Sequence, residues 1–236
     1  ADRLQTTENA RRRFVSDASH ELRTPVTVIK GYSDMLSRWG KQDPETLQEG
    51  LTAISSEAED MQELIEKLLF LARADQKRQI INKEVVEMSQ LIEDVFKKLE
   101  LTATRHEVAL LQNDAGKIFA DKVTIKQMLR IFLENAMKYT PAGGEITLSS
   151  IRLPGYLKVE IADTGMGIAP KDQEKIFQRF YRADTSRSKG DEQPGGTGLG
   201  LSIAQWIADQ HDMGISVESA LGQGSKFILM MPLCDA

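Results

Sequence analysis

The stretch "FVSDASHELRTPVTVIKGYSDML" (residues 14–36) carries the apolar stripe that decides the first part of the fold. Its apolar or small residues stand three and four positions apart, at Phe14, Ala18, Leu22, Pro25, Ile29, Tyr32 and Leu36. After a loop signal in "WGKQDPET", the spacing returns at Leu47, Leu51, Ile54, Ala58, Met61, Ile65, Leu68 and Ala72. This period predicts two helices, each with a heptad seam.

A hairpin of two such helices cannot cover its own apolar stripes. Burying one large apolar side chain contributes roughly 1.5–3 kcal/mol, so pairing two hairpins is favourable. We therefore predict a homodimer in which two antiparallel hairpins form a four-helix bundle. The alternative is that the seam packs against a second domain, but the seam spans the full length of both helices.

The pattern changes from about residue 80. "LKVEIADTG" (residues 157–165) and "GEITLSS" (residues 144–150) alternate apolar and polar residues, as strands do. "DKVTIKQMLRIFLENAMKY" (residues 121–139) has helical spacing, "GGTGLGLSIAQWIADQ" (residues 195–210) is a glycine loop running into a helix, and residues 215–232 predict a terminal hairpin with Gly222 and Gly224 in its turn. We predict a helical hairpin over 1–75, a linker over 76–81 and an α/β domain over 82–236.

Composition excludes several classes of protein. The net charge is -5 and charged residues make up 28% of the chain, so a general nucleic-acid coat is not expected. A single cysteine, Cys234, rules out a disulfide within one chain. No apolar run approaches the roughly 20 residues of a membrane span. Histidines with metal-ligand spacing are also absent.

Two glycine-rich runs indicate phosphate binding when they are read together. "DTGMG" (residues 163–167) follows a strand, and "GGTGLG" (residues 195–200) precedes a helix, where backbone N–H groups can meet phosphate. Neither matches a P-loop or a dinucleotide fingerprint, and either alone is typical of an ordinary turn. Asn135 and Lys138 share a helix face nearby; an amide oxygen suits Mg²⁺ and a lysine suits phosphate, although a solvated helix face is the plain alternative.

At this point the residues resemble a known family, the sensor histidine kinases of two-component signalling. "SHELRTP" resembles the family's H box, "ENAMKYTP" its N box, "DTGMGI" its G1 box, "IFQRFYRAD" its F box and "GGTGLGLSI" its G2 box. The motifs occur in the family's order from about residue 11 to residue 232, nearly the whole chain. The resemblance implies a dimerisation and histidine-phosphotransfer hairpin, followed by the α/β sandwich ATP-binding domain shared with gyrase-type and Hsp90-type ATPases.

The resemblance also assigns roles to residues, with ATP and Mg²⁺ as the cofactors. His20 is implied as the phosphorylated residue, Asn135 as the Mg²⁺ ligand and Asp163 as the residue that reads the adenine amino group. The other implied nucleotide contacts are Lys138, Tyr139, Gly165, Gly167, Phe180, Gly196, Thr197, Gly198, Leu199 and Gly200. A mobile lid is expected over about residues 181–195, flanked by Phe177 and Phe180.

Ile131 departs from the family pattern. The N box usually has a second Asn at that position, and related ATPases place there the carboxylate that activates water. Isoleucine can neither activate water nor ligate Mg²⁺, so we expect poor ATP hydrolysis. A smaller departure is "HDMG" at residues 211–214, where the family often has His-Gly-Gly.

His20 is expected to point to solvent, because it lies about 200° around the helix from the core-facing Ala18 and Leu22. An exposed imidazole is largely neutral at pH 7 and can attack the γ-phosphate in line. Adjacent Glu21 can accept the proton of the other ring nitrogen. Thr24, four residues on, matches the E-x-x-T pattern that the family associates with phosphatase activity.

Pro25 lacks an N–H and should bend the helix just past His20. The other histidines, His106 and His211, are expected at turn or surface positions.

The sequence therefore predicts an ATP-dependent autokinase of His20 that passes phosphate to an aspartate on a response regulator, with phosphatase activity toward that regulator. We expect no membrane contact by this segment and a cytoplasmic location, as the intracellular part of a membrane-anchored receptor. The alternative from another class is a non-catalytic, ATP-binding dimeric signalling scaffold, supported only by Ile131. A plain ATPase is a third reading, but it has no use for His20.

Overall fold

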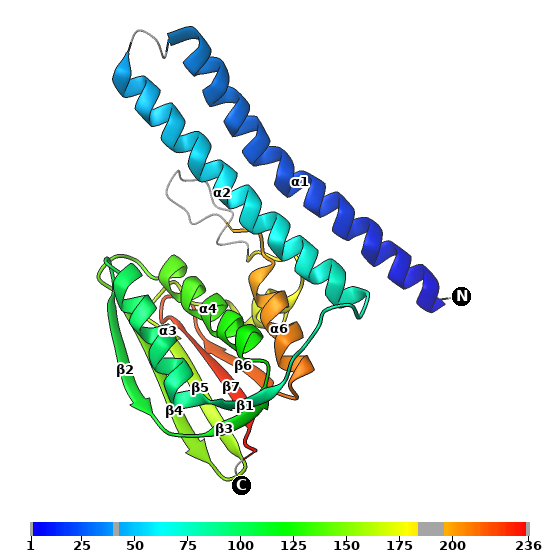
Figure 1. Ribbon diagram of the computed structural model, residues 1–236, viewed down its shortest axis with the longest axis vertical. Coiled ribbons are helices and arrows are strands. Elements are labelled where there is room, and N and C mark those ends of the chain that lie inside the picture. Colours follow the sequence, from blue (N-terminus) through cyan, green and yellow to red (C-terminus); the bar gives the residue numbers. More distant parts are fainter. Residues whose placement is uncertain (1, 40–42, 184–195, 235–236) are drawn as a thin grey trace. The chain divides into compact units, whose positions relative to one another are not determined.

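The chain consists of two compact units in the computed structural model, which describes residues 2–39, 43–183 and 196–234. The units are Ala1–Arg78 and Gln79–Ala236. The first is a helical hairpin and the second an α/β sandwich, as the sequence predicted. Figure 1 shows the elements of both units.

The hairpin unit consists of α1 (Asp2–Trp39) and α2 (Pro44–Asp75). Asp43 caps α2: its carboxylate accepts hydrogen bonds from the Glu45 N–H (3.1 Å) and the Thr46 hydroxyl (2.6 Å), and Pro44 occupies the first turn, where no N–H is needed. These bonds, that of Thr46 first, lower the pKa of Asp43. α1 continues through the buried Pro25 without interruption.

The two seams differ in how well the hairpin buries them. On α1 every predicted seam position is buried or half-buried. On α2 three large apolar residues of the predicted seam stay exposed within the single hairpin, as expected of a stripe that one hairpin cannot cover: Leu47, Leu51 and Ile65 are 40%, 51% and 42% exposed. The buried positions of α2 are instead Gly50, Leu64, Leu71 and Ala74. The apolar stripe of α2 is therefore wider than one seam, and part of it stays exposed.

Gly50 lets the two helices approach closely. A Cβ atom built there would lie 2.7 Å from Cδ2 and 2.8 Å from Cγ of Leu36 on α1, closer than carbon atoms can approach. Gly31, on an exposed part of α1, has no atom within 4 Å of such a Cβ. The two glycines therefore differ in packing while sharing a helical backbone.

This pair gives a test of the hairpin. Gly31→Ala should raise the free energy of unfolding by about 0.5–1 kcal/mol, because alanine favours the helix. Gly50→Ala should gain the same helix stabilisation, but the new methyl group forces Leu36 to move, which lowers the free energy of unfolding by about 1–3 kcal/mol. Urea unfolding followed by circular dichroism at 222 nm should place the Gly50 variant below the Gly31 variant. Equal stability would contradict the close packing at Gly50.

The α/β unit is built on a five-stranded sheet in the order β2-β4-β5-β7-β6. Its strands are β2 (Glu107–Asn113), β4 (Glu145–Leu153), β5 (Tyr156–Asp163), β6 (Gly214–Ser219) and β7 (Ser225–Pro232). Only the β2–β4 pair is parallel. The strand predicted within residues 157–165 and the terminal hairpin are confirmed, although the strand ends at Asp163, and Gly222 and Gly224 have φ of +74° and +80° in the hairpin turn.

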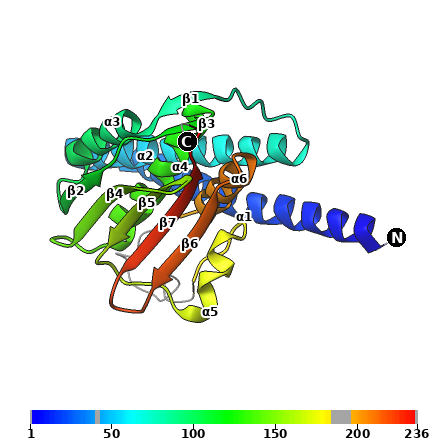
Figure 2. The same ribbon diagram turned by 90° about the horizontal axis from the view of Figure 1, so that it is seen from below.

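Helices α3 (Met88–Thr102), α4 (Lys122–Tyr139) and α6 (Gly200–Gln210) cover one face of this sheet (Figures 1 and 2). The sheet residues beneath them alternate, so that Leu157, Val159 and Ile161 of β5 are at most 1% exposed. A two-stranded ribbon of β1 (Glu84–Glu87) and β3 (Lys117–Ala120) precedes α3 and α4. The short α5 (Pro170–Gln173) and a 3₁₀ turn (Lys175–Phe177) follow β5.

Candidate active site

The last turns of α4 and the end of β5 form one side of the candidate site. Asn135, Lys138 and Tyr139 are all half-buried there. α4 begins where the sequence indicated, because the Asp121 carboxylate caps it by accepting the Thr124 N–H at 2.9 Å. This cap and the buried apolar face of α4 fix which side chains reach the site.

The DTGMG loop docks directly on the end of α4. The Met166 N–H donates to the Tyr139 carbonyl at 3.1 Å, and a side chain at Gly165 would collide with that same carbonyl. Gly167 has φ +70°, and a Cβ atom there would strike the Ala220 carbonyl in the β6–β7 turn. Both glycines are therefore required by close backbone approach, which brings the N box and the G1 box together.

Asp163 is the last residue of β5 and is half-buried beside this loop. Its Oδ1 accepts the Gly165 N–H at 2.8 Å. Burial nevertheless raises the pKa of the carboxyl above 3.8, although this hydrogen bond opposes the rise. The folded protein therefore holds a hydrogen-bond acceptor whose negative charge is poorly solvated.

Asp163→Asn should lower the affinity for adenine nucleotides without lowering the stability of the fold. Because the folded pKa is raised, the ionised carboxylate costs folding free energy at neutral pH, and this cost disappears as the pH falls toward 3.8. The asparagine variant keeps the acceptor for Gly165 and should be at least as stable as wild type at pH 7. Its adenine-nucleotide affinity should fall about tenfold or more, since a charged hydrogen bond is lost. Urea unfolding and calorimetric titration with ADP measure the two effects.

Asp114→Asn serves as the matched control for this prediction. The pKa of Asp114 is lowered, first by the hydrogen bond from the Arg152 N–H and then by that from Gln112. Its ionised form therefore adds stability above its ordinary pKa, and its loss should lower stability without changing nucleotide affinity. The interpretation of Asp163 would be wrong if both variants changed stability in the same direction.

The G2 loop forms the opposite side of the candidate site. Gly196 lies against the Lys138 ammonium, and Gly198, at φ +66°, lies against the backbone of Phe180 and Tyr181. The Phe180 N–H donates to the Gly198 carbonyl at 3.0 Å, and Phe180 itself has φ +59°. Thr197 is half-buried and Leu199 is buried. The F box and the N box thus meet the G2 box, as the resemblance implied.

Ile131 lies beneath the end of this loop. It is 7% exposed, and a Cβ atom on Gly200 would be 3.3 Å from its Cγ2. The position that carries a polar side chain in the family pattern is therefore an apolar packing contact between α4 and α6 in this chain.

Two cationic side chains lie near Tyr139. The Lys138 ammonium is 5.5 Å from the centroid of the Tyr139 ring. Burial raises the pKa of the Tyr139 hydroxyl, and the positive charge of Arg182 opposes that rise. Sequence reasoning missed Arg182, although its basic character within "FQRFYRAD" was a usable signal. A pair of cations at this place suits the phosphates of a nucleotide.

The start of the expected lid is anchored by Tyr181, whose hydroxyl donates to Oδ1 of the buried Asp172 at 2.7 Å. The rest of the expected lid, residues 184–195, lies outside the described residues. Phe177 ends the 3₁₀ turn that precedes it and is half-buried.

Asn135 offers an oxygen that suits Mg²⁺, and the site fits such an ion only when a nucleotide supplies further oxygen ligands. Within the described residues, no group of three His, Cys, Asp or Glu side chains could hold a metal by itself. The protein would thus supply one amide oxygen to Mg²⁺, and phosphate and water oxygens would complete the coordination shell of the ion.

The candidate phospho-acceptor lies in the other unit, on α1. His20 and Thr24 are exposed, as predicted, and Glu21 is half-buried. These three positions lie within one continuous helix, so the imidazole and the threonine hydroxyl are one turn apart on the same face.

His211 stands in a turn, as predicted, but its side chain does not lie at the surface. It follows α6 but is only 4% exposed, and both ring nitrogens are within hydrogen-bond distance of backbone atoms. His106 is half-buried, with Nε2 2.9 Å from the Thr140 carbonyl. Neither is an exposed nucleophile.

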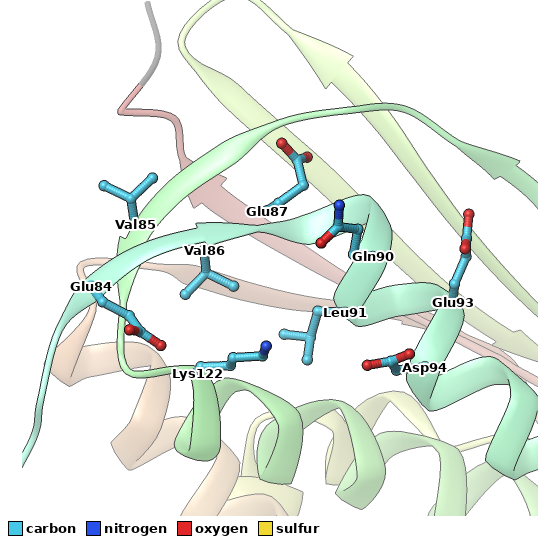
Figure 3. A pocket seen from close by; sticks show the side chains of 9 residues that line it. All are labelled: Glu84, Val85, Val86, Glu87, Gln90, Leu91, Glu93, Asp94 and Lys122. Carbon is cyan, nitrogen blue, oxygen red and sulfur yellow. The ribbon is translucent and has the colours of Figure 1, made fainter.

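A separate hollow of about 520 Å³ lies between β1, α3 and the start of α4 (Figure 3). Figure 3 shows the carboxylates of Glu84 and Asp94 on either side of Lys122. Its lining residues are Glu84, Val85, Val86, Glu87, Gln90, Leu91, Glu93, Asp94 and Lys122. Four carboxylates against one ammonium repel phosphate, and no residue of the motifs lines the hollow. It is therefore not the nucleotide site.

Two family models match this chain. The His Kinase A (phospho-acceptor) domain matches residues 10–77, and the histidine kinase-, DNA gyrase B- and HSP90-like ATPase matches residues 120–235. The fold and the site thus define a histidine kinase core, with an acceptor hairpin and an ATPase domain. The chain belongs to the sensor histidine kinases of two-component signalling.

Individual relatives agree with this assignment. The chain is 39% identical over 212 residues to the sensor histidine kinase YkoH of Bacillus subtilis (strain 168), covering 90% of this chain and 45% of YkoH. The chain therefore spans about half the length of the curated relatives it matches. None of the helices in the described part of the chain has the length and apolar character needed to cross a membrane.

Solved structures share the fold. Histidine kinase ThkA in complex with response regulator protein TrrA matches 98% of this chain and 63% of that chain, with a TM-score of 0.74 and 24% identity. Full-length ShkA in complex with AMPPNP matches 94% of this chain and 46% of that chain, with a TM-score of 0.66 and 26% identity.

Proposed function

We propose that this chain is the catalytic core of an ATP-dependent protein-histidine kinase that phosphorylates His20. One observation carries the proposal: the N, G1, F and G2 motifs, which are far apart in the sequence, meet around Lys138 and Tyr139. ATP binding is supported further by the structural match to ShkA, which was solved with AMPPNP, an ATP analogue.

Each residue of the candidate site would have a distinct role. The half-buried Asp163 accepts the adenine amino group, Lys138 and Arg182 meet the phosphates, and Asn135 provides an oxygen to Mg²⁺, which neutralises phosphate charge when bound. The neutral imidazole of His20 attacks the γ-phosphorus, so that an N–P bond forms. The bond from the γ-phosphorus to the bridging oxygen breaks, and ADP leaves.

Glu21 would complete the proton balance of this step. The attacking imidazole becomes positively charged as the N–P bond forms, and its other nitrogen then loses a proton to the neighbouring carboxylate. The exposure of His20 supports its own role as the phosphate acceptor, because a buried imidazole could not reach a nucleotide bound in a separate unit.

The buried Ile131 suits a kinase that spares ATP for histidine. A polar or acidic side chain at this place could position water against the γ-phosphate, whereas isoleucine packs against Gly200 and excludes it. We therefore expect slow ATP hydrolysis. The same residue is the one observation in favour of the non-catalytic scaffold.

The partners would be a second copy of the chain and a response regulator. The exposed apolar residues Leu47, Leu51 and Ile65 on α2 support a homodimer built on a four-helix bundle. The match to ThkA, whose solved structure contains the response regulator TrrA, supports transfer of phosphate to a receiver aspartate. In the full-length protein we expect this core to be cytoplasmic and to form the intracellular part of a membrane-anchored receptor, as the relatives named sensor kinases suggest.

The test of the kinase is incubation with γ-labelled ATP and Mg²⁺. Wild type should gain label that is stable to base and lost in acid, because a phosphoramidate N–P bond is acid-labile. His20→Gln should gain none while binding nucleotide normally, since substitution of an exposed residue changes stability by only about 0.5 kcal/mol. Unlabelled wild type with intact nucleotide binding would favour the scaffold, and Ile131→Asn would then be the first variant to assay.

Phosphatase activity is proposed from Thr24, whose hydroxyl could orient a water toward a phosphorylated aspartate. Thr24→Ala should keep autophosphorylation while slowing dephosphorylation of a receiver domain about tenfold or more. The receiver used is one that the wild-type core phosphorylates in vitro.

Thr27→Ala is the matched control for this variant. Thr27 is also exposed on α1, but its hydroxyl donates to the Arg23 carbonyl at 2.9 Å and lies about 10 Å along the helix from His20. Its loss should leave both activities unchanged. Equal dephosphorylation rates in the two variants would remove Thr24 from the mechanism.

A further inference from the structure

A hydrogen-bond relay joins α4 and α6 at the ends that lie away from the candidate site. His211 Nδ1 is 2.7 Å from the Ile207 carbonyl of α6, and its Nε2 is 3.0 Å from the Asp121 backbone nitrogen at the start of α4. A carbonyl can only accept and a backbone N–H can only donate. The geometry therefore requires a neutral imidazole with its proton on Nδ1.

Asp121 extends the relay in two further directions. Its Oδ1 caps α4 through the Thr124 N–H, and its Oδ2 accepts the Asn82 N–H at 2.8 Å. Asp121 and His211 are 7% and 4% exposed, so water cannot readily replace these bonds. Asn82 belongs to the segment between α2 and β1, so this relay also ties that segment to both helices.

Both helices carry candidate nucleotide contacts at their opposite ends. Lys138 and Tyr139 are in the last turn of α4, and Gly200 begins α6 directly after the G2 loop. A helix behaves as a stiff rod of about 1.5 Å per residue, so a change in angle at one end moves the other. The Ile131–Gly200 contact joins the same helices near the site.

We propose that His211 is a positioning residue for the nucleotide site: its neutral ring holds α4 and α6 in register, and its protonation releases them and weakens nucleotide binding. The inference rests on the proposed function, because it concerns the affinity of that same site. Protonation of Nε2 would place an N–H against the Asp121 N–H, so this bond would be lost, while the Nδ1–H bond to the Ile207 carbonyl would remain.

The surroundings of the ring oppose its protonation at neutral pH. Burial lowers the pKa of His211 below 6.5, and the positive charge of Lys83 lowers it further. The Ile207 carbonyl and the carboxylates of Asp121 and Asp212 act in the opposite direction. Because the folded pKa is lowered, the contribution of His211 to stability is complete above pH 6.5 and is lost as the pH falls through the folded value.

Two substitutions dissect the relay without leaving a titratable ring. His211→Gln can place Oε1 near the position of Nε2 and accept the Asp121 N–H, so it keeps the link between the helices. His211→Asn is shorter: its amide can replace Nδ1 against Ile207 but cannot reach Asp121. His211→Gln therefore retains the link between α4 and α6, and His211→Asn loses it.

The experiment measures the dissociation constant of ADP with Mg²⁺ by calorimetry between pH 5.5 and pH 8. At pH 8 His211→Asn should bind about tenfold more weakly than wild type, a size typical of coupling between distant sites, and His211→Gln should bind within about threefold. On acidification wild type should lose affinity relative to His211→Gln. Circular dichroism at each pH confirms that each protein remains folded.

Two results would overturn the proposal: equal affinities of the two variants, or the same pH dependence in wild type and His211→Gln. A merely structural histidine would change thermal stability without producing that difference in pH dependence. If wild type bound no nucleotide, the proposed function would fail. The relay would then be judged by hydrogen exchange of the amides at residues 199–202, which should be faster in His211→Asn than in His211→Gln and equal if the proposal is wrong.

Discussion

The site depends on one steric constraint: no side chain fits between the loop that leaves β5 and the final carbonyl of α4. The Tyr139 carbonyl is one of the groups that a helix leaves without an internal partner at its C-terminus. The Met166 N–H satisfies it, and this bond is possible only because Gly165 has no Cβ atom. The helix end and the wall of the pocket are thus made by the same contact, which brings the acidic end of β5 to the basic end of α4.

A second constraint of the same kind acts at the beginning of α6. The G2 loop passes the Lys138 ammonium at Gly196 and the backbone of Phe180 at Gly198, and enters the helix over Ile131. These contacts are side chain to backbone or backbone to backbone, and glycine permits each of them. Both sides of the site therefore depend on how α4 lies against its neighbours. The contacts of Asp121 at the start of α4 matter because they help to fix that position.

Sequence reasoning succeeded where the signal was local. α4 carries its own cap at Asp121, β5 its own alternation, and the terminal hairpin its own glycines, so each was predicted with nearly its true bounds. Helix α3 was missed although Met88, Leu91, Ile92, Val95, Phe96 and Leu99 repeat at helical spacing. The motif residues meet as the resemblance implied, because a family pattern records contacts that the spacing within one sequence does not contain.

The missed features depend on contacts between distant residues. The parallel pairing of β2 with β4 leaves no mark in either strand. The burial of His211 depends on a backbone N–H that is 90 positions away, so "ADQHDMG" looks like an ordinary polar turn. On α2 a regular heptad concealed that Gly50, and not Leu51, is the buried position that faces Leu36. Apolar spacing predicts which face of a helix is buried, but the helix that packs against it determines which residues at the edge of that face are covered.

The hairpin exposes both an apolar stripe and His20, so different faces of α1 and α2 must carry these two features. A hairpin that buried all its apolar residues internally would have no reason to associate, and one that used every face for association would hide His20. Placing the proposed acceptor, His20, about 200° from the seam of α1 satisfies both demands on one helix. The ATPase unit of the proposed kinase meets a related demand, since a site that transferred phosphate to an exposed imidazole would also be open to water. The apolar contact of Ile131 with Gly200 addresses this by removing the polar group that would have put such a water to use. In the proposed mechanism, selectivity for histidine over water would then depend on what the N box lacks as much as on what it contains.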